Sequence, residues 1–219
     1  MHNKVLYSAV FDGDYPFGEL FKAVTTITNP DHMTEKDSAL ILWGGGDISP
    51  SLYGHGVSKR TGAGAEPNNR DLIEWDLATR AVEMGVPVIG ICRGAQLMCA
   101  MSGGYLIQDV TGHGGTHNMC VMGTNEIIAT SSLHHQMMSP WGVDHKIIAF
   151  ASPSRSNRYV IHPPHSAEDI ILDDVPCEPE IVWFPKTKAL AIQGHPEFMG
   201  VDSRYVKYCF ELVNQYVLQ

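Results

Sequence analysis

A cysteine stands at the centre of the pentapeptide 90–94, Gly-Ile-Cys-Arg-Gly, between an apolar run at 86–89 and a helix-like stretch at 95–101. A strand that turns sharply into a helix needs small residues on both sides of the turn, and Gly90 and Gly94 meet that need. At a helix N-terminus, free N–H groups and the helix dipole favour the thiolate of Cys92 over the thiol. Cys92 is therefore a candidate nucleophile, and a buried packing cysteine is the alternative.

A histidine and a glutamate two residues apart follow another apolar run, at 189–192. Pro196 keeps His195 out of the helical region, so the segment is expected to be extended. In an extended segment residues i and i+2 point the same way, so Glu197 can hold one ring nitrogen of His195 while the other faces a nucleophile. With Cys92 the pair forms a candidate Cys-His-Glu triad.

Three glycines, residues 44–46, end a third apolar run at 40–43. In an acyl-transfer enzyme such glycines can supply backbone N–H groups to an oxyanion hole, with the N–H of Arg93 as the second donor. A phosphate-binding loop is not favoured, because no Gly-Lys-Ser/Thr follows and the dinucleotide-binding spacing is absent. A plain turn from strand to loop remains the alternative.

These segments together resemble the class I glutamine amidotransferase family, and within it the gamma-glutamyl-gamma-aminobutyrate hydrolase-like branch, peptidase C26. The matching motifs occur in the family's order from about residue 39 to the C-terminus: WGGGDISPSLYG, NRDLIEWDLATRAVEMGVPVIGICRGAQLMCAMSGGYLIQD, SSLHHQ and IQGHPEF. Each motif alone is weak, whereas the combination is specific.

The resemblance implies that Cys92 attacks the side-chain amide of glutamine or of a gamma-glutamyl compound. It implies that His195 acts as base and acid and that Glu197 orients it. It further implies a flavodoxin-like class I amidotransferase fold, backbone oxyanion donors at Gly45 or Gly46 and at Arg93, and glutamyl contacts near Gln96, Leu133 and His134.

Composition favours one cytoplasmic domain spanning residues 1–219. The chain is 44% hydrophobic and carries a net charge of −9, so nucleic acid is not an expected partner. It has no apolar run of about 18 residues and no signal-peptide pattern at its N-terminus, so no membrane association is expected. Five cysteines without a C-x-x-C motif favour a reducing compartment over a disulfide framework or a zinc site.

Apolar runs alternate with helical patterns along the chain, which predicts an α/β fold with three layers: a largely parallel central sheet with helices on both faces. We expect strands at 4–10 and before the glycines and Cys92, and helices near 17–24, at 71–84 and after Cys92. Later strands are expected at 126–129, 146–152 and 180–184, and a closing helix at 203–217. The ligand should lie at the carboxyl ends of the parallel strands.

Eleven histidines make a metal site the rival hypothesis. His113 and His117 have i, i+4 spacing, but neighbouring glycines make a helix improbable, so we give that spacing no geometric meaning and expect no metal. His134 is expected at the mouth of the pocket, with a solvated loop histidine as the alternative. Residues 152–166 are rich in turn formers and are expected to form a surface loop near the site.

The expected activity is therefore hydrolysis of a gamma-glutamyl amide through a thioester, without a cofactor. One alternative is a glutaminase subunit that passes ammonia to a separate synthetase, for which an apolar surface around the pocket is expected. A non-catalytic binding protein is a second alternative, and a cysteine peptidase acting on longer peptides is a third. An oligomer is compatible with all of them.

Overall fold

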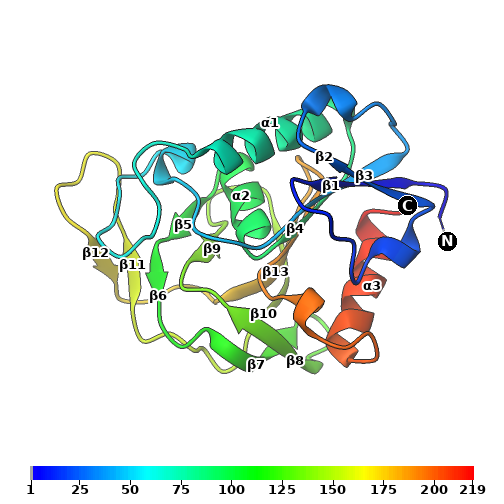
Figure 1. The fold of residues 1–219 in the computed structure, drawn as a ribbon. Coiled ribbons are helices and arrows are strands. Elements are labelled where there is room, and N and C mark those ends of the chain that lie inside the picture. Colours follow the sequence, from blue (N-terminus) through cyan, green and yellow to red (C-terminus); the bar gives the residue numbers. More distant parts are fainter. Residues whose placement is uncertain (1) are drawn as a thin grey trace.

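A nine-stranded sheet runs through the centre of the computed structural model, which describes residues 2–219 (Figure 1). The strands lie in the order β2-β1-β3-β4-β14-β13-β10-β7-β8. Their bounds, in that order, are Ala23–Ile27, Val5–Ala9, Ser38–Leu42, Val88–Ile91, Ala189–Ile192, Pro179–Phe184, Lys146–Ala151, Gly114–Val121 and Ile127–Leu133.

The sheet has a parallel half and an antiparallel half. Five strands are parallel to one another: β2, β1, β3, β4 and β14. From β14 onward each pair is antiparallel, through β13, β10, β7 and β8. The predicted α/β class is confirmed, with a mixed sheet. The parallel half holds the carboxyl ends at which a ligand site is expected.

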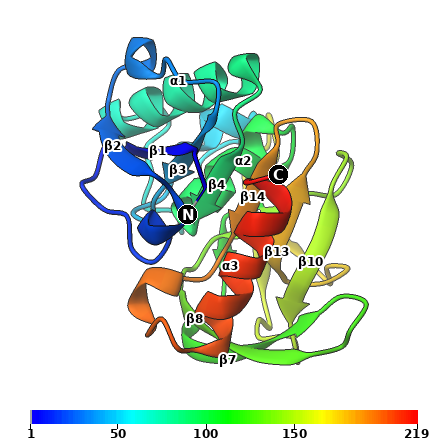
Figure 2. The ribbon, with the colours of Figure 1, turned by 90° about the vertical axis from the view of Figure 1, so that its right-hand side faces the viewer.

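Helices cover both faces of the sheet, as predicted (Figure 2). Helices α1, Asn69–Met84, and α2, Arg93–Met101, pack on one face, and α3, Arg204–Tyr216, packs on the other. Successive residues of β3 alternate between the two layers: Leu40 and Leu42 belong to the core with α1 and α2, and Ile41 belongs to the core with α3. Strands buried on both faces explain the continuous apolar runs in the sequence.

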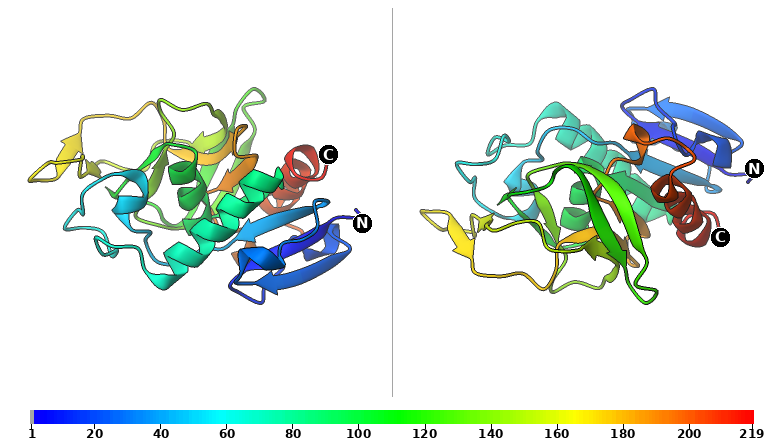
Figure 3. Two further views of the ribbon diagram at one scale, coloured as in Figure 1. Left: turned by 90° about the horizontal axis from the view of Figure 1, so that it is seen from above. Right: turned by 90° about the horizontal axis from the view of Figure 1, so that it is seen from below.

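Two small sheets extend the molecule away from its termini (Figure 3). Strand β5, Tyr105–Ile107, pairs with β9, Met137–Ser139. Strand β11, Tyr159–Ile161, pairs with β12, Ile170–Leu172, and with β6, Asp109–Val110. The expected surface loop at 152–166 therefore contains a short strand, and its chain continues into this outlying sheet. Within residues 2–219, no helix combines the length and the apolar character that crossing a bilayer requires.

The prediction of a helix near residues 17–24 is wrong. A short 3-10 turn, Gly18–Leu20, occupies part of that stretch, and strand β2 begins at Ala23. The run Val-Thr-Thr-Ile favours a strand because β-branched side chains fit a pleated surface, and β2 pairs in parallel with β1. The other predicted helices and strands are present, with ends within a few residues of those expected.

Gly94 allows the first turn of α2 to lie against β3. A Cβ added at this position would lie 2.3 Å from the carbonyl oxygen of Leu42 and 2.7 Å from its carbonyl carbon. We therefore expect Gly94→Ala to lower the free energy of unfolding by about 1–3 kcal/mol, the usual cost of overpacking, as measured by urea denaturation. Gly200→Ala is the control, since a Cβ there meets nothing within 4 Å. Equal stability of both variants would contradict this prediction.

Candidate active site

The three segments singled out in the sequence meet at one edge of the sheet. Strand β4 lies between β3 and β14, and its last residue, Ile91, pairs with Ile192. Cys92 follows Ile91, and the 193–197 segment follows Ile192, so both emerge side by side. Leu42 pairs with Gly90, which places the start of the glycine turn next to them.

Cys92 occupies a strained turn between β4 and α2. Its φ of 48° is positive, a region that residues other than glycine seldom adopt, and only 4% of its surface is exposed. Gln193, which is fully buried, donates a side-chain N–H to the Cys92 sulfur at 3.9 Å. Backbone strain at such a turn is typical of nucleophile elbows, so the geometry agrees with the sequence prediction.

His195 is oriented by Glu197, as expected from their spacing. The Nδ1 of His195 lies 2.7 Å from Oε1 of Glu197. Its Nε2 is buried without a hydrogen-bond partner among the described residues. Burial opposes the charged form of His195, but its interactions with Cys92 and Glu197 outweigh burial and raise its pKa to about 9.

Neighbouring residues fix the position of the His195 ring and backbone. The ring of Phe198 stacks on it with 4.5 Å between ring centroids and an angle of 9°. The hydroxyl of Ser131, in β8, donates to the carbonyl oxygen of His195 at 2.5 Å. The backbone N–H of His195 in turn donates to the hydroxyl oxygen of Ser131 at 3.1 Å. Ser131 and Gln193 lie within the SSLHHQ and IQGHPEF motifs, but the sequence assigns them no role, because serine and glutamine at these positions carry no signal for the backbone and thiol contacts that they make.

The glycine turn approaches the catalytic side chains closely. A Cβ on Gly44 would lie 2.7 Å from Cε1 of His195 and 3.6 Å from Cβ of Cys92. Within residues 2–219, no hydrogen bond uses the backbone N–H of Gly45, Gly46 or Arg93. These are the N–H groups for which the sequence predicts an oxyanion hole, and the described residues leave them without a hydrogen-bond partner.

A buried charge network joins α1 to the elbow and the glycine turn. The Arg93 guanidinium forms ion pairs with Asp71 and Glu74 of α1, and all three side chains are at most 2% exposed. Arg70 pairs with Glu74 at 2.8 Å and donates to the carbonyl oxygens of Trp43 and Gly44, each at 3.0 Å. One network therefore sets both sides of the expected oxyanion hole.

The residues expected to contact a glutamyl group divide into two sets. Leu133 is 67% exposed and lines the cavity in front of His195. Gln96 and His134 do not line it: the amide of Gln96 donates to the carbonyl of Gln136 at 3.0 Å, and Nδ1 of His134 donates to the same carbonyl at 2.8 Å. These two side chains hold the 134–136 segment in place behind the cavity.

A cavity of about 410 Å³ opens in front of the histidine. His195 and Glu197 form its polar side, and the Gly44 and Gly45 backbone forms one wall. The remaining lining is apolar and aromatic: Phe11, Trp43, Leu133 and Phe198. Residues 152–166 do not line this cavity, so the surface loop expected near the site lies elsewhere.

His113 and His117 come together, contrary to the inference that their spacing has no geometric meaning. Their ring centroids are 5.2 Å apart, and His117 lies in strand β7 rather than in a helix. Residues four apart in a regular strand share a face but lie about 13 Å apart. The two rings meet because His113 precedes β7 and the chain departs from extended geometry at Gly115, whose φ is 88°. The glycines excluded a helix but not this arrangement.

Glu74 gives a direct test of the charge network. Glu74 pairs with the buried Arg93 and with the partly exposed Arg70. Replacing its carboxylate leaves Arg93 underpaired, so we expect Glu74→Gln to destabilise the fold by about 3–5 kcal/mol in urea. Glu83→Gln, at an exposed position of the same helix, is the matched control and should change the free energy of unfolding by less than about 0.5 kcal/mol. Similar effects of the two substitutions would mean that the network does not support the fold.

Comparisons with known proteins agree with this fold. Residues 21–121 match the Peptidase C26 family. A glutamine amidotransferase-like protein, YvdE, of Lactococcus lactis is 26% identical over 193 residues, covering 79% of this chain and 71% of that protein. Protein NtpR of Enterococcus hirae is 42% identical over 73 residues, covering 33% of this chain and 29% of NtpR.

Solved structures share the fold at low sequence identity. The crystal structure of a glutamine amidotransferase, TM1158, from Thermotoga maritima has a TM-score of 0.55 and is 12% identical, covering 98% of this chain and 86% of that one. The structure of PurLQS from the same organism has a TM-score of 0.60 at 16% identity and covers 99% of both chains. The chain thus has the class I glutamine amidotransferase fold and matches the peptidase C26 family over residues 21–121, which confirms the family resemblance expected from its sequence.

Proposed function

We propose that the protein hydrolyses the side-chain amide of glutamine or of a gamma-glutamyl amine through a thioester on Cys92. The observation that carries this proposal is the placement of His195, whose Nδ1 is held by Glu197 while its buried Nε2 is free beside Cys92. A nucleophile, a base and a group that orients the base are the parts that covalent acyl transfer requires.

Acylation uses the Cys92 thiolate and protonated His195. The Cys92 thiolate adds to the γ-carbonyl carbon, and the carbonyl electrons move to oxygen, where the N–H groups of Arg93 and of Gly45 or Gly46 stabilise the charge. The protonated His195 then gives its Nε2 proton to the departing nitrogen as the C–N bond breaks. The products of this half-reaction are a glutamyl thioester and a free amine or ammonia.

Deacylation reverses these roles. Neutral His195 takes a proton from water, the resulting hydroxide adds to the thioester carbonyl, and the C–S bond breaks to release glutamate and the Cys92 thiolate. Glu197 stabilises the imidazolium formed in this step and keeps Nε2 aimed at the reacting atoms. The thiolate and protonated His195 are thereby restored for the next cycle.

The cavity suggests which amine leaves. Its walls are formed by Phe11, Trp43, Leu133 and Phe198, which offer apolar contacts and few hydrogen bonds. A gamma-glutamyl amine with an alkyl or aromatic leaving group buries apolar surface there, whereas ammonia leaves this surface uncovered. We therefore expect gamma-glutamyl amines with apolar amine groups to have higher kcat/KM than glutamine.

A glutaminase subunit is the second candidate, and one observation favours it. Leu133 and Phe198 at the cavity mouth are 67% and 64% exposed, and Phe11 is 44% exposed. Exposed apolar side chains around a pocket are also what a partner protein would cover. On this hypothesis the isolated chain reacts with glutamine analogues but turns over slowly until a synthetase binds.

Replacement of the nucleophile tests the proposed function. We expect Cys92→Ala to fold normally and to lose all covalent labelling by 6-diazo-5-oxo-L-norleucine, because this diazoketone alkylates a thiol, with loss of N2, to form a thioether, and the variant has no thiol at position 92. Intact mass spectrometry measures the labelling, and a panel of glutamine and gamma-glutamyl amines measures turnover. Cys177→Ala is the control, since this partly exposed cysteine lies outside the site.

The outcomes separate the candidate functions. Labelling of the wild-type protein together with turnover of a gamma-glutamyl amine supports the stand-alone hydrolase. Labelling with little turnover favours the glutaminase subunit, and release of internal peptide fragments would favour a peptidase. Labelling of Cys92→Ala, or none of the wild type, would contradict the cysteine mechanism.

The pH dependence of acylation tests the role of Glu197. Since the pKa of His195 is raised to about 9, the acid form is present below that pH, and kcat/KM should fall as pH rises through about 9. Glu197→Gln removes a carboxylate that raises this pKa, so the alkaline limb of the pH profile of kcat/KM should move to lower pH. Glu35→Gln, an exposed position, should leave the limb in place. An unchanged limb in Glu197→Gln would show that Glu197 does not tune His195.

A further inference from the structure

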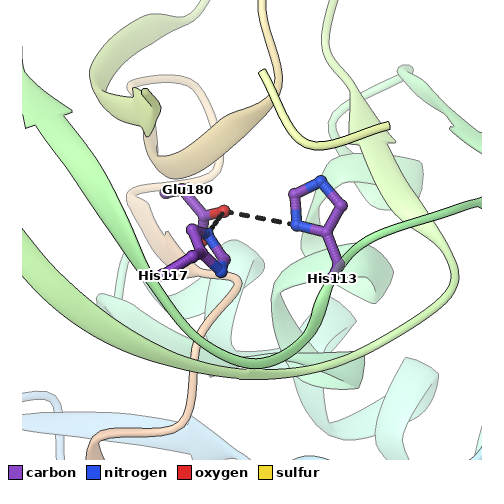
Figure 4. A group of neighbouring side chains, drawn as sticks. All are labelled: His113, His117 and Glu180. Carbon is purple, nitrogen blue, oxygen red and sulfur yellow. Dashed lines mark hydrogen bonds and ion pairs between the residues drawn. The ribbon is translucent and has the colours of Figure 1, made fainter. Parts of the chain in front are cut away.

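Two histidines and a glutamate form a buried cluster on the antiparallel side of the sheet (Figure 4). His113 directly precedes β7, His117 lies within β7, and Glu180 lies in β13. Their exposed fractions are 2%, 6% and 1%. The proposed reaction uses none of these side chains, and none lines the cavity in front of His195.

One potential ligand atom from each residue lies within 4.8 Å of the others. Nε2 of His117 is 2.6 Å from Oε1 of Glu180, and Nδ1 of His113 is 3.6 Å from the same oxygen. In a tetrahedral zinc site, bonds of about 2.0–2.1 Å place neighbouring ligand atoms roughly 3.4 Å apart. The separations of 2.6 and 3.6 Å lie on either side of that spacing.

A second carboxylate orients His113. Nε2 of His113 donates to Oε2 of Glu178 at 3.1 Å, which leaves Nδ1 as the nitrogen that faces Glu180. Glu178 is itself held by the backbone N–H groups of Arg155 and Ser156, at 2.6 and 2.7 Å, and by the hydroxyl of Tyr159 at 2.7 Å. A histidine whose other nitrogen binds a firmly held carboxylate is the usual arrangement behind a metal ligand.

Unpartnered atoms also point to a missing positive charge. Nδ1 of His113 and Oε2 of Glu180 are buried without a hydrogen-bond partner among the described residues. Burying polar atoms without hydrogen-bond partners is costly.

We propose that His113, His117 and Glu180 bind a divalent transition-metal ion, with Zn²⁺ the best match to two imidazoles and one carboxylate. The metal would join β7 to β13, and Glu178 would be the residue that positions His113. Two nitrogen ligands and one oxygen ligand are typical of zinc rather than of Ca²⁺ or Mg²⁺, which prefer oxygen. Three protein ligands leave a fourth position for water.

The cluster lies next to the segment behind the catalytic cavity. The ring of His134 packs on that of His113 with centroids 4.6 Å apart, and Nδ1 of His134 donates to the Gln136 carbonyl. A metal at the cluster would therefore stabilise the 134–136 segment through His113 without contacting substrate.

The test measures metal binding in the Cys92→Ala protein, so that the active-site thiol cannot bind the metal instead. After chelator treatment, the full chain is titrated with Co²⁺ and followed by visible absorption and by metal content. We expect one Co²⁺ per chain, intense absorption typical of a four-coordinate site, displacement by Zn²⁺ and a higher Tm with Zn²⁺. Because this protein is inactive by design, the result does not depend on the proposed hydrolase activity.

Four variants in the same background assign the ligands. His117→Ala and Glu180→Gln should abolish the absorption, and His32→Ala, an exposed histidine, should leave it unchanged. Glu178→Gln keeps all three ligands and should weaken the affinity about 10–100-fold, which remains informative if a ligand variant fails to fold. No saturable absorption in the parent protein, or unchanged binding in His117→Ala and Glu180→Gln, would overturn the proposal and leave the cluster as a proton-sharing ion pair.

Discussion

The buried ion pairs between Arg93 and the two acidic residues of α1, Asp71 and Glu74, constrain everything around the nucleophile. Arg93 follows Cys92 directly and is the first residue of α2. Its side chain links the turn at Cys92 to α1 through these ion pairs. Removing such charges from water is expensive, and the cost is recovered only if every partner is in place. The strained turn at Cys92, the glycine turn and the helix N-terminus therefore form together or not at all.

Much of the site could be predicted because its chemistry is local. Cys92, His195 and Glu197 each follow an apolar run that becomes a buried strand, and parallel strands bring such ends to one edge. Gly44 escaped notice as the position nearest the catalytic side chains, because three consecutive glycines look alike in a sequence. Asp71 and Glu74 were missed for a related reason: helical periodicity indicates which face is apolar, but not that a carboxylate on α1 meets a buried arginine.

Long-range contacts explain the remaining errors. Glu180 is 63 residues from His117, and no local pattern connects them. The glycines near His113 make a helix improbable, but they do not prevent a strand: β7 pairs with β8 from Gly114 onward. The helix expected near residues 17–24 is also incorrect, because parallel pairing with β1 favours a strand from Ala23.

Strand β14 joins two halves of the sheet that differ in direction. It is parallel to β4 on one side and antiparallel to β13 on the other, and His195 follows it directly. The distance between His195 and Cys92, the proposed base and nucleophile, is therefore set where the parallel and antiparallel halves of the sheet meet. On the proposed mechanism, a substitution in the antiparallel half that displaces β13 would move His195 relative to Cys92, so a residue far from the cavity would alter the reaction without touching the substrate.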